Sequence, residues 1–232
     1  QKLGVSFSLA KQMLSKSKYY IISGMAVIVV QYTDKFMLKN MLNDEVTGFY
    51  SAAVTCAGVT SFVFTAIIDS MRPQVLKQKQ VSTEKFEAHI STLYSVIWYF
   101  SLAQCLVTTV FAKPIIYLLY GEAYFPAASV LQISGWVIAF GYMGNILSIW
   151  ILGENKDSSI IGLGIFGAGT NVVLNLLFIP KYGAVGAAAS LITQFLKNVV
   201  YCLCVKSLRR SVRLMLRGMN PKFALQQLRK RL

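Results

Sequence analysis

The chain has 232 residues, of which 55% are hydrophobic and only 14% are charged. Soluble domains are typically about 45–50% apolar and about 25% charged, so this composition excludes an ordinary soluble protein. The formal net charge of +14 would suit a nucleic-acid partner. However, the basic residues are grouped between long apolar segments, which favours a membrane protein with no nucleic-acid partner.

Apolar segments along the chain predict six transmembrane helices. An apolar run of about 18 or more residues can span roughly 30 Å of hydrocarbon. The predicted spans cover residues 19–39, 48–71, 90–112, 127–152, 158–179 and 184–206. We therefore expect an all-α integral membrane protein with a basic lead-in at 1–18, a six-helix lobe at 19–206 and a basic tail at 207–232. Because the chain begins with Gln1 rather than Met, we also expect it to be a fragment of a longer transporter.

The positions of the charges predict how these helices are oriented. Most of the 23 lysines and arginines lie near the two termini, between the second and third spans, or between the fourth and fifth. Alternating helices place all these segments on one side, which the positive-inside rule assigns to the cytoplasm. The tail is expected to lie on anionic lipid headgroups, with Leu208, Val212 and Met215 facing lipid and the arginines facing phosphate. A plain stop-transfer flank is the alternative.

The first span contains two adjacent charges, Asp34 and Lys35, one turn after Gln31. A charge at mid-helix costs about 2.5–3.5 kcal/mol and usually faces a bundle interior or a wet cavity. These side chains are therefore candidate functional residues. The alternative is a pair near the outer surface that extends to the lipid headgroups.

Later spans add further polar side chains. Lys197 lies deep in the sixth span and shares its helix face with Gln194 and Asn198. Asn145 lies in the fourth span, and the fifth contains two asparagines one turn apart, Asn171 and Asn175. We expect cavity lining by Lys197, Gln194, Asn198, Asn145 and Asn175, with hydrogen bonding between helices as the alternative for the amides.

Three further features are assigned structural roles. Asp69, three residues before Arg72, is expected to form an ion pair at the membrane surface. The motif "GLGIFG" at residues 162–167 matches GxGxxG but lies inside an apolar run, so close helix packing is expected rather than nucleotide binding. The cysteines, Cys56, Cys105, Cys202 and Cys204, have no metal-ligand spacing, and we expect free thiols and no metal.

The order of short motifs resembles that in a known family. "DKFML" at 34–38 is followed by "GFYSAA" at 48–53, "MRPQVLKQK" at 71–79, "YGEAYFPAASVLQI" at 120–133 and "NVVLNLLFIPKYGAVGAAAS" at 171–190. This series resembles the C-terminal half of polysaccharide flippases of the O-antigen (Wzx) type. These belong to the MATE-like superfamily of multidrug, oligosaccharidyl-lipid and polysaccharide exporters.

The resemblance implies one lobe of a two-lobed transporter that works by alternating access around a central cavity. It implies a non-enzymatic flippase for an undecaprenyl-pyrophosphate-linked oligosaccharide, in the inner membrane of a bacterium that makes lipopolysaccharide. Lys35 and Lys197 are then expected to bind the anionic substrate, and Asp34 to bind a coupling H⁺ or Na⁺, with no other cofactor. A polysaccharide polymerase is a further expected partner.

Other functions are weighed against this one. A cation-coupled drug exporter of the same superfamily would favour acidic cavity residues, for which only Asp34 and Asp69 are available. A membrane-embedded glycosyl- or acyltransferase would need a site such as His89 with Glu84 and Glu87. A scaffold that does not transport is the third alternative.

Overall fold

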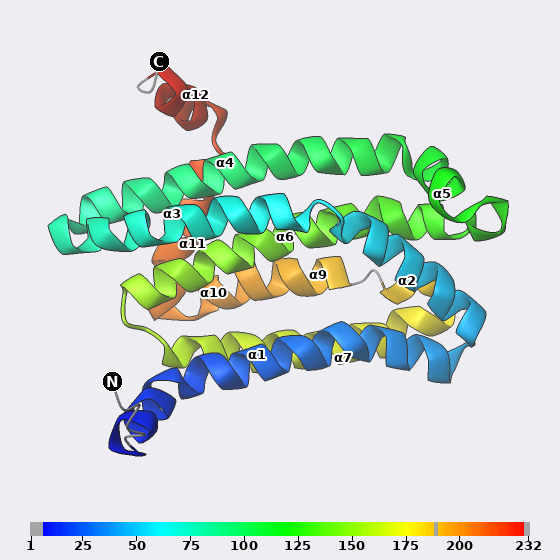
Figure 1. Ribbon diagram of the computed structural model, residues 1–232, viewed down its shortest axis with the longest axis horizontal. Coiled ribbons are helices and arrows are strands. Elements are labelled where there is room, and N and C mark those ends of the chain that lie inside the picture. Colours follow the sequence, from blue (N-terminus) through cyan, green and yellow to red (C-terminus); the bar gives the residue numbers. More distant parts are fainter. Residues whose placement is uncertain (1–6, 188–189, 230–232) are drawn as a thin grey trace, which may run out of the picture.

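The computed structural model describes residues 7–187 and 190–229, and this part of the chain is helical (Figure 1). The longer helices are α1 (Phe7–Met41), α2 (Asp44–Gly58), α3 (Ser61–Val81), α4 (Thr83–Val110), α6 (Ala127–Gly153) and α7 (Ser158–Tyr182). The shorter ones are α5 (Ala112–Tyr120), α8 (Ala184–Ala187), α9 (Ser190–Phe195), the π-helix η2 (Leu196–Tyr201), α10 (Cys202–Cys204), α11 (Arg209–Met219) and α12 (Pro221–Arg229). Short 3₁₀ turns cover Glu122–Tyr124 and Lys206–Leu208.

Four stretches in the described residues are long and apolar enough to cross a membrane: α4, α6, α7 and Ala184–Cys204. The pair α2–α3 adds a fifth if its two helices count as one span, although they are bent by 44°. The all-helical membrane fold is therefore confirmed in this coarser form. The six-span lobe stays a prediction, because the 35-residue α1, which contains the predicted first span, is not among these stretches.

The predicted second and sixth spans are not single α-helices. The second is broken at Val59 and Thr60, where α2 ends and α3 begins at an angle. The sixth contains the π-helix η2 between α9 and α10, and residues 188 and 189, between α8 and α9, lie outside the described part of the chain. Breaks of this kind leave backbone groups outside the regular α-helical ladder, and in a membrane such groups are tolerated only where protein or a wet cavity surrounds them.

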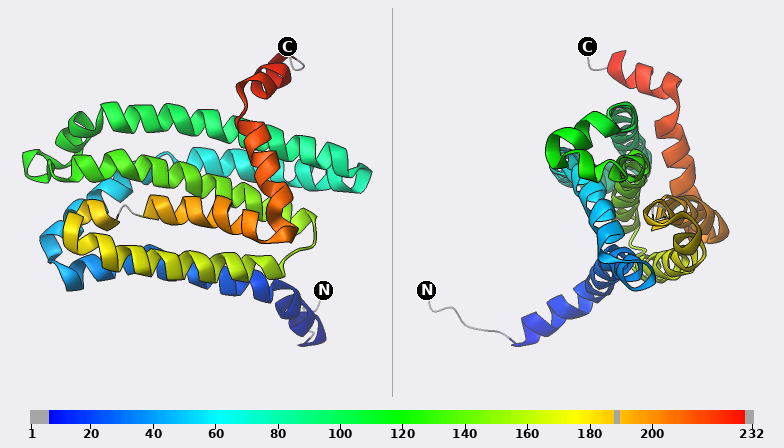
Figure 2. Two further views of the ribbon diagram at one scale, coloured as in Figure 1. Left: turned by 180° about the vertical axis from the view of Figure 1, so that it is seen from behind. Right: turned by 90° about the vertical axis from the view of Figure 1, so that its right-hand side faces the viewer.

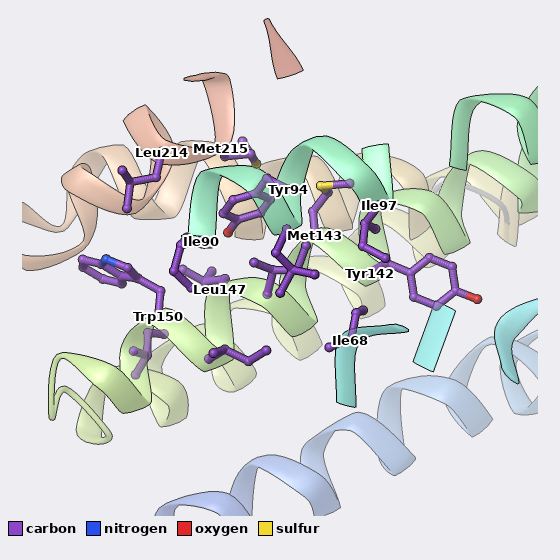
Figure 3. Packing of buried hydrophobic residues seen from close by; sticks show 14 of the residues in the cluster. Ile68, Ile90, Tyr94, Ile97, Tyr142, Met143, Leu147, Trp150, Leu214 and Met215 are labelled. Carbon is purple, nitrogen blue, oxygen red and sulfur yellow. The ribbon is translucent and has the colours of Figure 1, made fainter. Parts of the chain in front are cut away.

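The helix α6 lies at the centre of the bundle and contacts α2, α3, α4, α5 and α9 (Figure 1). On one side, buried residues of α3, α4, α6 and α11 form an apolar core that includes Ile90, Tyr94, Met143 and Trp150 (Figure 3). A second core joins the end of α1 to α2, α5 and α6. The long helices α1 and α7 pack side by side along the opposite edge of the bundle.

The tail helix α11 runs across the long helices rather than along them (Figure 2). Leu208, Val212 and Met215 are buried in the core with α4, so the prediction that they face lipid is wrong. Gly218 permits this packing, because a Cβ atom there would lie 2.6 Å from the Cβ of Tyr94 in α4. The apolar face of α11 thus has a protein partner, which the tail sequence alone does not reveal.

An ion pair anchors the start of α11. The Arg210 guanidinium donates a hydrogen bond of 2.8 Å to the carboxylate of Glu87 in α4. This hydrogen bond, together with the charge of Glu87, raises the pKa of Arg210 above its ordinary value. Lys79 forms a second ion pair with Glu154, which joins the end of α3 to the end of α6. The helices that meet at this end of the bundle are therefore held together by charge as well as by apolar packing.

Candidate functional site

A cavity of about 570 Å³ lies beside α6 and brings together most of the polar residues singled out in the sequence. Its lining includes Lys35 from α1, Asn145 from α6, Gln194 from α9, and Lys197 and Asn198 from η2. Apolar and small residues of α2, α6 and α7 form much of the remaining wall. Residues distant in the sequence thus meet around one space of a size usual for ligand pockets, which measure about 300–1,000 Å³.

The π-helix η2 positions Lys197 and Asn198 in the cavity wall. A π-turn has a wider hydrogen-bond spacing than an α-turn and is frequent at functional sites. The side-chain amide of Asn198 donates a hydrogen bond of 2.8 Å to the backbone carbonyl of Phe140 in α6, which fixes its orientation. The second polar atom of that side chain, Oδ1, is buried and has no hydrogen-bond partner among the described residues. The same holds for Gln194 Oε1.

Glycines of the neighbouring helices make room for this segment. A Cβ atom at Gly167 in α7 would lie 3.0 Å from Cδ of Lys197, and one at Gly144 in α6 would lie 3.2 Å from Oδ1 of Asn198. A Cβ atom at Gly162 would collide with the hydroxyl of Tyr201. The glycine motif of α7 therefore serves close helix packing, as predicted, and the surface that it accommodates includes Lys197.

The cavity is positively charged. Lys35 and Lys197 are both half-buried, and neither forms an ion pair with another described residue. The described residues that line the cavity include no carboxylate. A partly buried lysine without a counter-charge attracts an anion strongly, because the low-dielectric surroundings screen its charge less than water does.

Asp34 is adjacent to Lys35 in the chain, but its side chain lies in a different environment. It is only 5% exposed and is not part of the cavity lining. Its Oδ2 accepts a hydrogen bond of 2.8 Å from the hydroxyl of Tyr50 in α2. Its Oδ1 accepts hydrogen bonds from the side-chain amides of Asn171, at 3.0 Å, and Asn175, at 2.6 Å, both in α7. Asp34 therefore does not extend to the lipid headgroups, and Asn175 lies against this carboxylate rather than along the cavity.

Asp34, Tyr50, Asn171 and Asn175 form a buried polar cluster, here called the Asp34 cluster. One acceptor atom of this cluster has no partner among the described residues. Asn175 Oδ1 is buried and has no hydrogen-bond partner among the described residues. The cluster thus combines a carboxylate, a phenol and two amides, and the carboxylate accepts hydrogen bonds from three neutral side chains. Sequence reasoning missed Tyr50, which lies in the motif "GFYSAA" but on another helix, with no local signal of its contact with Asp34. The side chain of Gln31 lies outside the described residues.

Other residues singled out in the sequence form ion pairs or hydrogen bonds outside the cavity. Asp69 and Arg72 form the expected ion pair, at 3.0 Å, with both side chains about half-exposed. His89 Nδ1 lies 2.8 Å from the carbonyl oxygen of Lys85 in its own helix, and Glu87 is paired with Arg210. Each of these two side chains thus has a contact within the protein. The described residues contain no group of three His, Cys, Asp or Glu side chains placed to hold a metal.

The chain is similar in sequence to two known proteins. Over 196 residues the chain is 21% identical to the probable low-salt glycan biosynthesis flippase Agl15 of Haloferax volcanii. This match covers 84% of this chain and 42% of the relative. Over 192 residues it is 24% identical to the uncharacterized membrane protein MJ1068 of Methanocaldococcus jannaschii. This match covers 81% of this chain and 38% of the relative. The chain thus spans less than half the length of these two relatives. No solved structure matches it significantly.

The family described as "Polysaccharide biosynthesis protein" matches residues 1–129, more than half of the chain. This region contains the motif around Asp34 and Lys35, the bent pair α2–α3 and all of the predicted first three spans. The resemblance to MATE-like polysaccharide flippases that the motif order indicated is thereby confirmed. This multi-pass membrane chain belongs to the polysaccharide biosynthesis protein family.

Proposed function

We propose that this chain forms one lobe of a flippase that moves a lipid-linked oligosaccharide across a membrane by alternating access. The observation that carries the proposal is the cavity with Lys35 and Lys197, two unpaired lysines, and no carboxylate in its described lining. Such a cavity suits the phosphate that links a sugar to its lipid carrier. The family membership and the glycan flippase among the relatives support the same class of substrate.

The amides beside the lysines suit the sugar part of this substrate. Gln194 Oε1 and Asn198 Oδ1 are buried acceptors without a described partner, and Asn145 is an exposed amide of the same cavity. An amide that faces the cavity, as Asn145 does, can bind sugar hydroxyl groups, and the two buried acceptors would bind them after a turn of their side chains toward the cavity. In the finer form of the proposal, the substrate is an undecaprenyl-pyrophosphate-linked O-antigen repeat unit, and the protein lies in a bacterial inner membrane with its termini in the cytoplasm. A polysaccharide polymerase then takes over the flipped unit.

We propose that Asp34 binds the coupling cation, H⁺ or Na⁺, at a site separate from the substrate. The cluster around it is buried and polar, and Asn175 Oδ1 is an unused oxygen ligand beside the carboxylate. A membrane potential contributes about 2.3 kcal/mol per elementary charge per 100 mV, which is enough to drive the return step of a charged carrier. Flipping by Asp34→Asn should therefore lose its dependence on an ion gradient, whereas substrate binding should remain.

The central test is neutralisation of the two cavity lysines in the full-length transporter. Loss of a hydrogen bond to a charged group costs about 1.5–3 kcal/mol, so Lys35→Ala and Lys197→Ala should each lower the flipping rate at limiting substrate by about tenfold or more. Lys113→Ala is the matched control, because Lys113 is exposed in α5 and lies outside the cavity. Flipping is followed with a fluorescent lipid-linked oligosaccharide in proteoliposomes, and protein content is measured by immunoblot.

Normal flipping by the Lys35→Ala, Lys197→Ala double variant, at normal protein content, would overturn the assignment of the cavity. Efflux of cationic drugs by the wild-type protein, with no flipping of lipid-linked oligosaccharide, would instead support a drug exporter. The cavity lining makes that outcome unexpected, because cationic drugs favour acidic residues and the described lining includes none.

A further inference from the structure

A second hollow lies away from the cavity, between α4 and α12, and is almost entirely apolar. Its volume is about 460 Å³. Val96, Tyr99 and Phe100 form its wall on α4, and Pro221, Ala224 and Leu225 form its wall on α12. Phe100 and Leu225 are respectively 56% and 60% exposed, so the hollow is an open groove lined by uncovered apolar surface.

Two of the four polar side chains that border this groove, Thr92 and Tyr99, form hydrogen bonds within the protein. The hydroxyl of Thr92 donates a hydrogen bond of 2.9 Å to the carbonyl of Ala88 in its own helix. The hydroxyl of Tyr99 donates one of 3.1 Å to the carbonyl of Met219, where α11 ends. Because these donors are used internally, they are not available to a polar ligand, and the groove suits a hydrocarbon chain.

The position of the groove places it in contact with the membrane. Its α4 wall runs from Thr92 to Phe100, inside a helix that is long and apolar enough to cross the bilayer. The helix α11 crosses the bundle next to it (Figure 2), and Gly218 of α11 packs closely on Ser91 and Tyr94 at the start of this apolar part. With α4 spanning the bilayer as proposed, α11 would lie along the membrane plane, near the level where lipid headgroups begin.

Basic residues stand at this level beside the groove. Arg213 and Arg217 are exposed and one turn apart on α11, and Lys222 is exposed at the start of α12. The guanidinium of Arg217 lies 4.9 Å from the ring centroid of Phe223 in α12, which holds it near the helix that forms the groove. An apolar slot with cations at its headgroup end is complementary to an anionic lipid.

We propose that the groove between α4 and α12 binds an acyl chain of an anionic membrane phospholipid, whose phosphate contacts Arg213, Arg217 and Lys222. The lipid fills the space between the two helices and thereby docks α12 against the bundle. This site is distinct from the substrate cavity and does not depend on the proposed flippase activity. It also differs from a tail that merely rests on headgroups, because one lipid is held by both its chain and its phosphate.

The test uses the full-length protein in detergent, titrated with phosphatidylglycerol or phosphatidylcholine and followed by native mass spectrometry. Wild-type protein should retain phosphatidylglycerol in preference to phosphatidylcholine. The Arg217→Gln, Lys222→Gln variant should lose about tenfold or more in affinity for phosphatidylglycerol, as expected for two juxtamembrane charges. Ala224→Trp, which fills the groove, should cause a similar loss. Lys77→Gln, an exposed lysine of α3 outside the groove, should bind like wild type.

A second measurement needs no variant. Phosphatidylglycerol with a photoreactive group in its acyl chain should label peptides that contain residues 96–100 and 221–227. Labelling spread evenly over the lipid-facing helices would overturn the proposal, as would equal retention of the two lipids. The proposal would also be overturned if the Arg217→Gln, Lys222→Gln variant lost affinity for phosphatidylglycerol while Ala224→Trp did not. That result would indicate attraction to the lipid headgroup without a bound acyl chain.

Discussion

Gly167 in α7 is predicted to control the position of Lys197. In the variant Gly167→Ala, the new Cβ would lie 3.0 Å from Cδ of Lys197 and 3.8 Å from its Cγ. Non-bonded carbon atoms prefer separations of about 3.5–4.0 Å, so the lysine side chain has to move by roughly 0.5 Å or more. Because Gly167 is buried between helices, this shift changes where the ammonium group sits in the cavity.

Two opposing terms determine the stability of this variant. Replacing glycine by alanine inside a helix gains about 0.8–1 kcal/mol of helix propensity. Overpacking of a filled interior costs about 1–3 kcal/mol, so the variant should unfold at a slightly lower temperature than wild type, or at the same one. Its flipping rate should fall by about tenfold, because misplacement of a positioned group costs far more in activity than in stability.

Gly169→Ala is the matched control for this prediction. Gly169 lies in the same helix, but a Cβ atom there meets no atom within 4 Å. This control should gain thermal stability and flip at the wild-type rate. Both variants are measured by thermal unfolding in detergent and by flipping in proteoliposomes. Equal flipping by Gly167→Ala and Gly169→Ala would refute the reasoning that Gly167 positions Lys197.

Three further changes test the contacts around the site and the tail. Tyr50→Phe removes one of the donors to Asp34 and should lower the free energy of unfolding by about 1 kcal/mol, measured by denaturation in detergent; an unchanged value would contradict the hydrogen bond. Gly218→Ala should force α11 away from α4, measured as faster proteolysis of the tail, and unaltered cleavage would count against the close contact. Arg210→Gln leaves the buried carboxylate of Glu87 unpaired and should lower the unfolding temperature, whereas an unchanged temperature would show the pair to be neutral.

Much of the candidate site could be predicted from residue type and depth. Lys35, Lys197, Gln194, Asn198 and Asn145 stand out because polar side chains in apolar helices are costly and need a polar environment. All five line the cavity in the structure. The sequence does not separate Asp34 from Lys35, because adjacent residues on a helix point about 100° apart and only the neighbouring helices show what each one meets.

For the tail, the sequence predicted an apolar helix face but not what that face contacts. Its amphipathic pattern is the same whether the apolar face meets lipid or protein, since both are apolar environments. The burial of Leu208, Val212 and Met215 depends on the close approach of Gly218 to α4, a contact between residues far apart in the chain. A helical pattern therefore identifies the face that is buried but not its partner.

The sequence by itself determined that this is a helical membrane protein, which family it resembles, and which polar residues lie within long apolar segments. This is possible because a segment that crosses the bilayer has to be apolar along its whole length, and this property can be read from the sequence residue by residue. Only the tertiary structure decided that Tyr50, Asn171 and Asn175 surround Asp34, that η2 directs Lys197 into the cavity, and that α11 lies against α4. These contacts join helices distant in sequence, and their geometry depends on how close each pair of helices can pack.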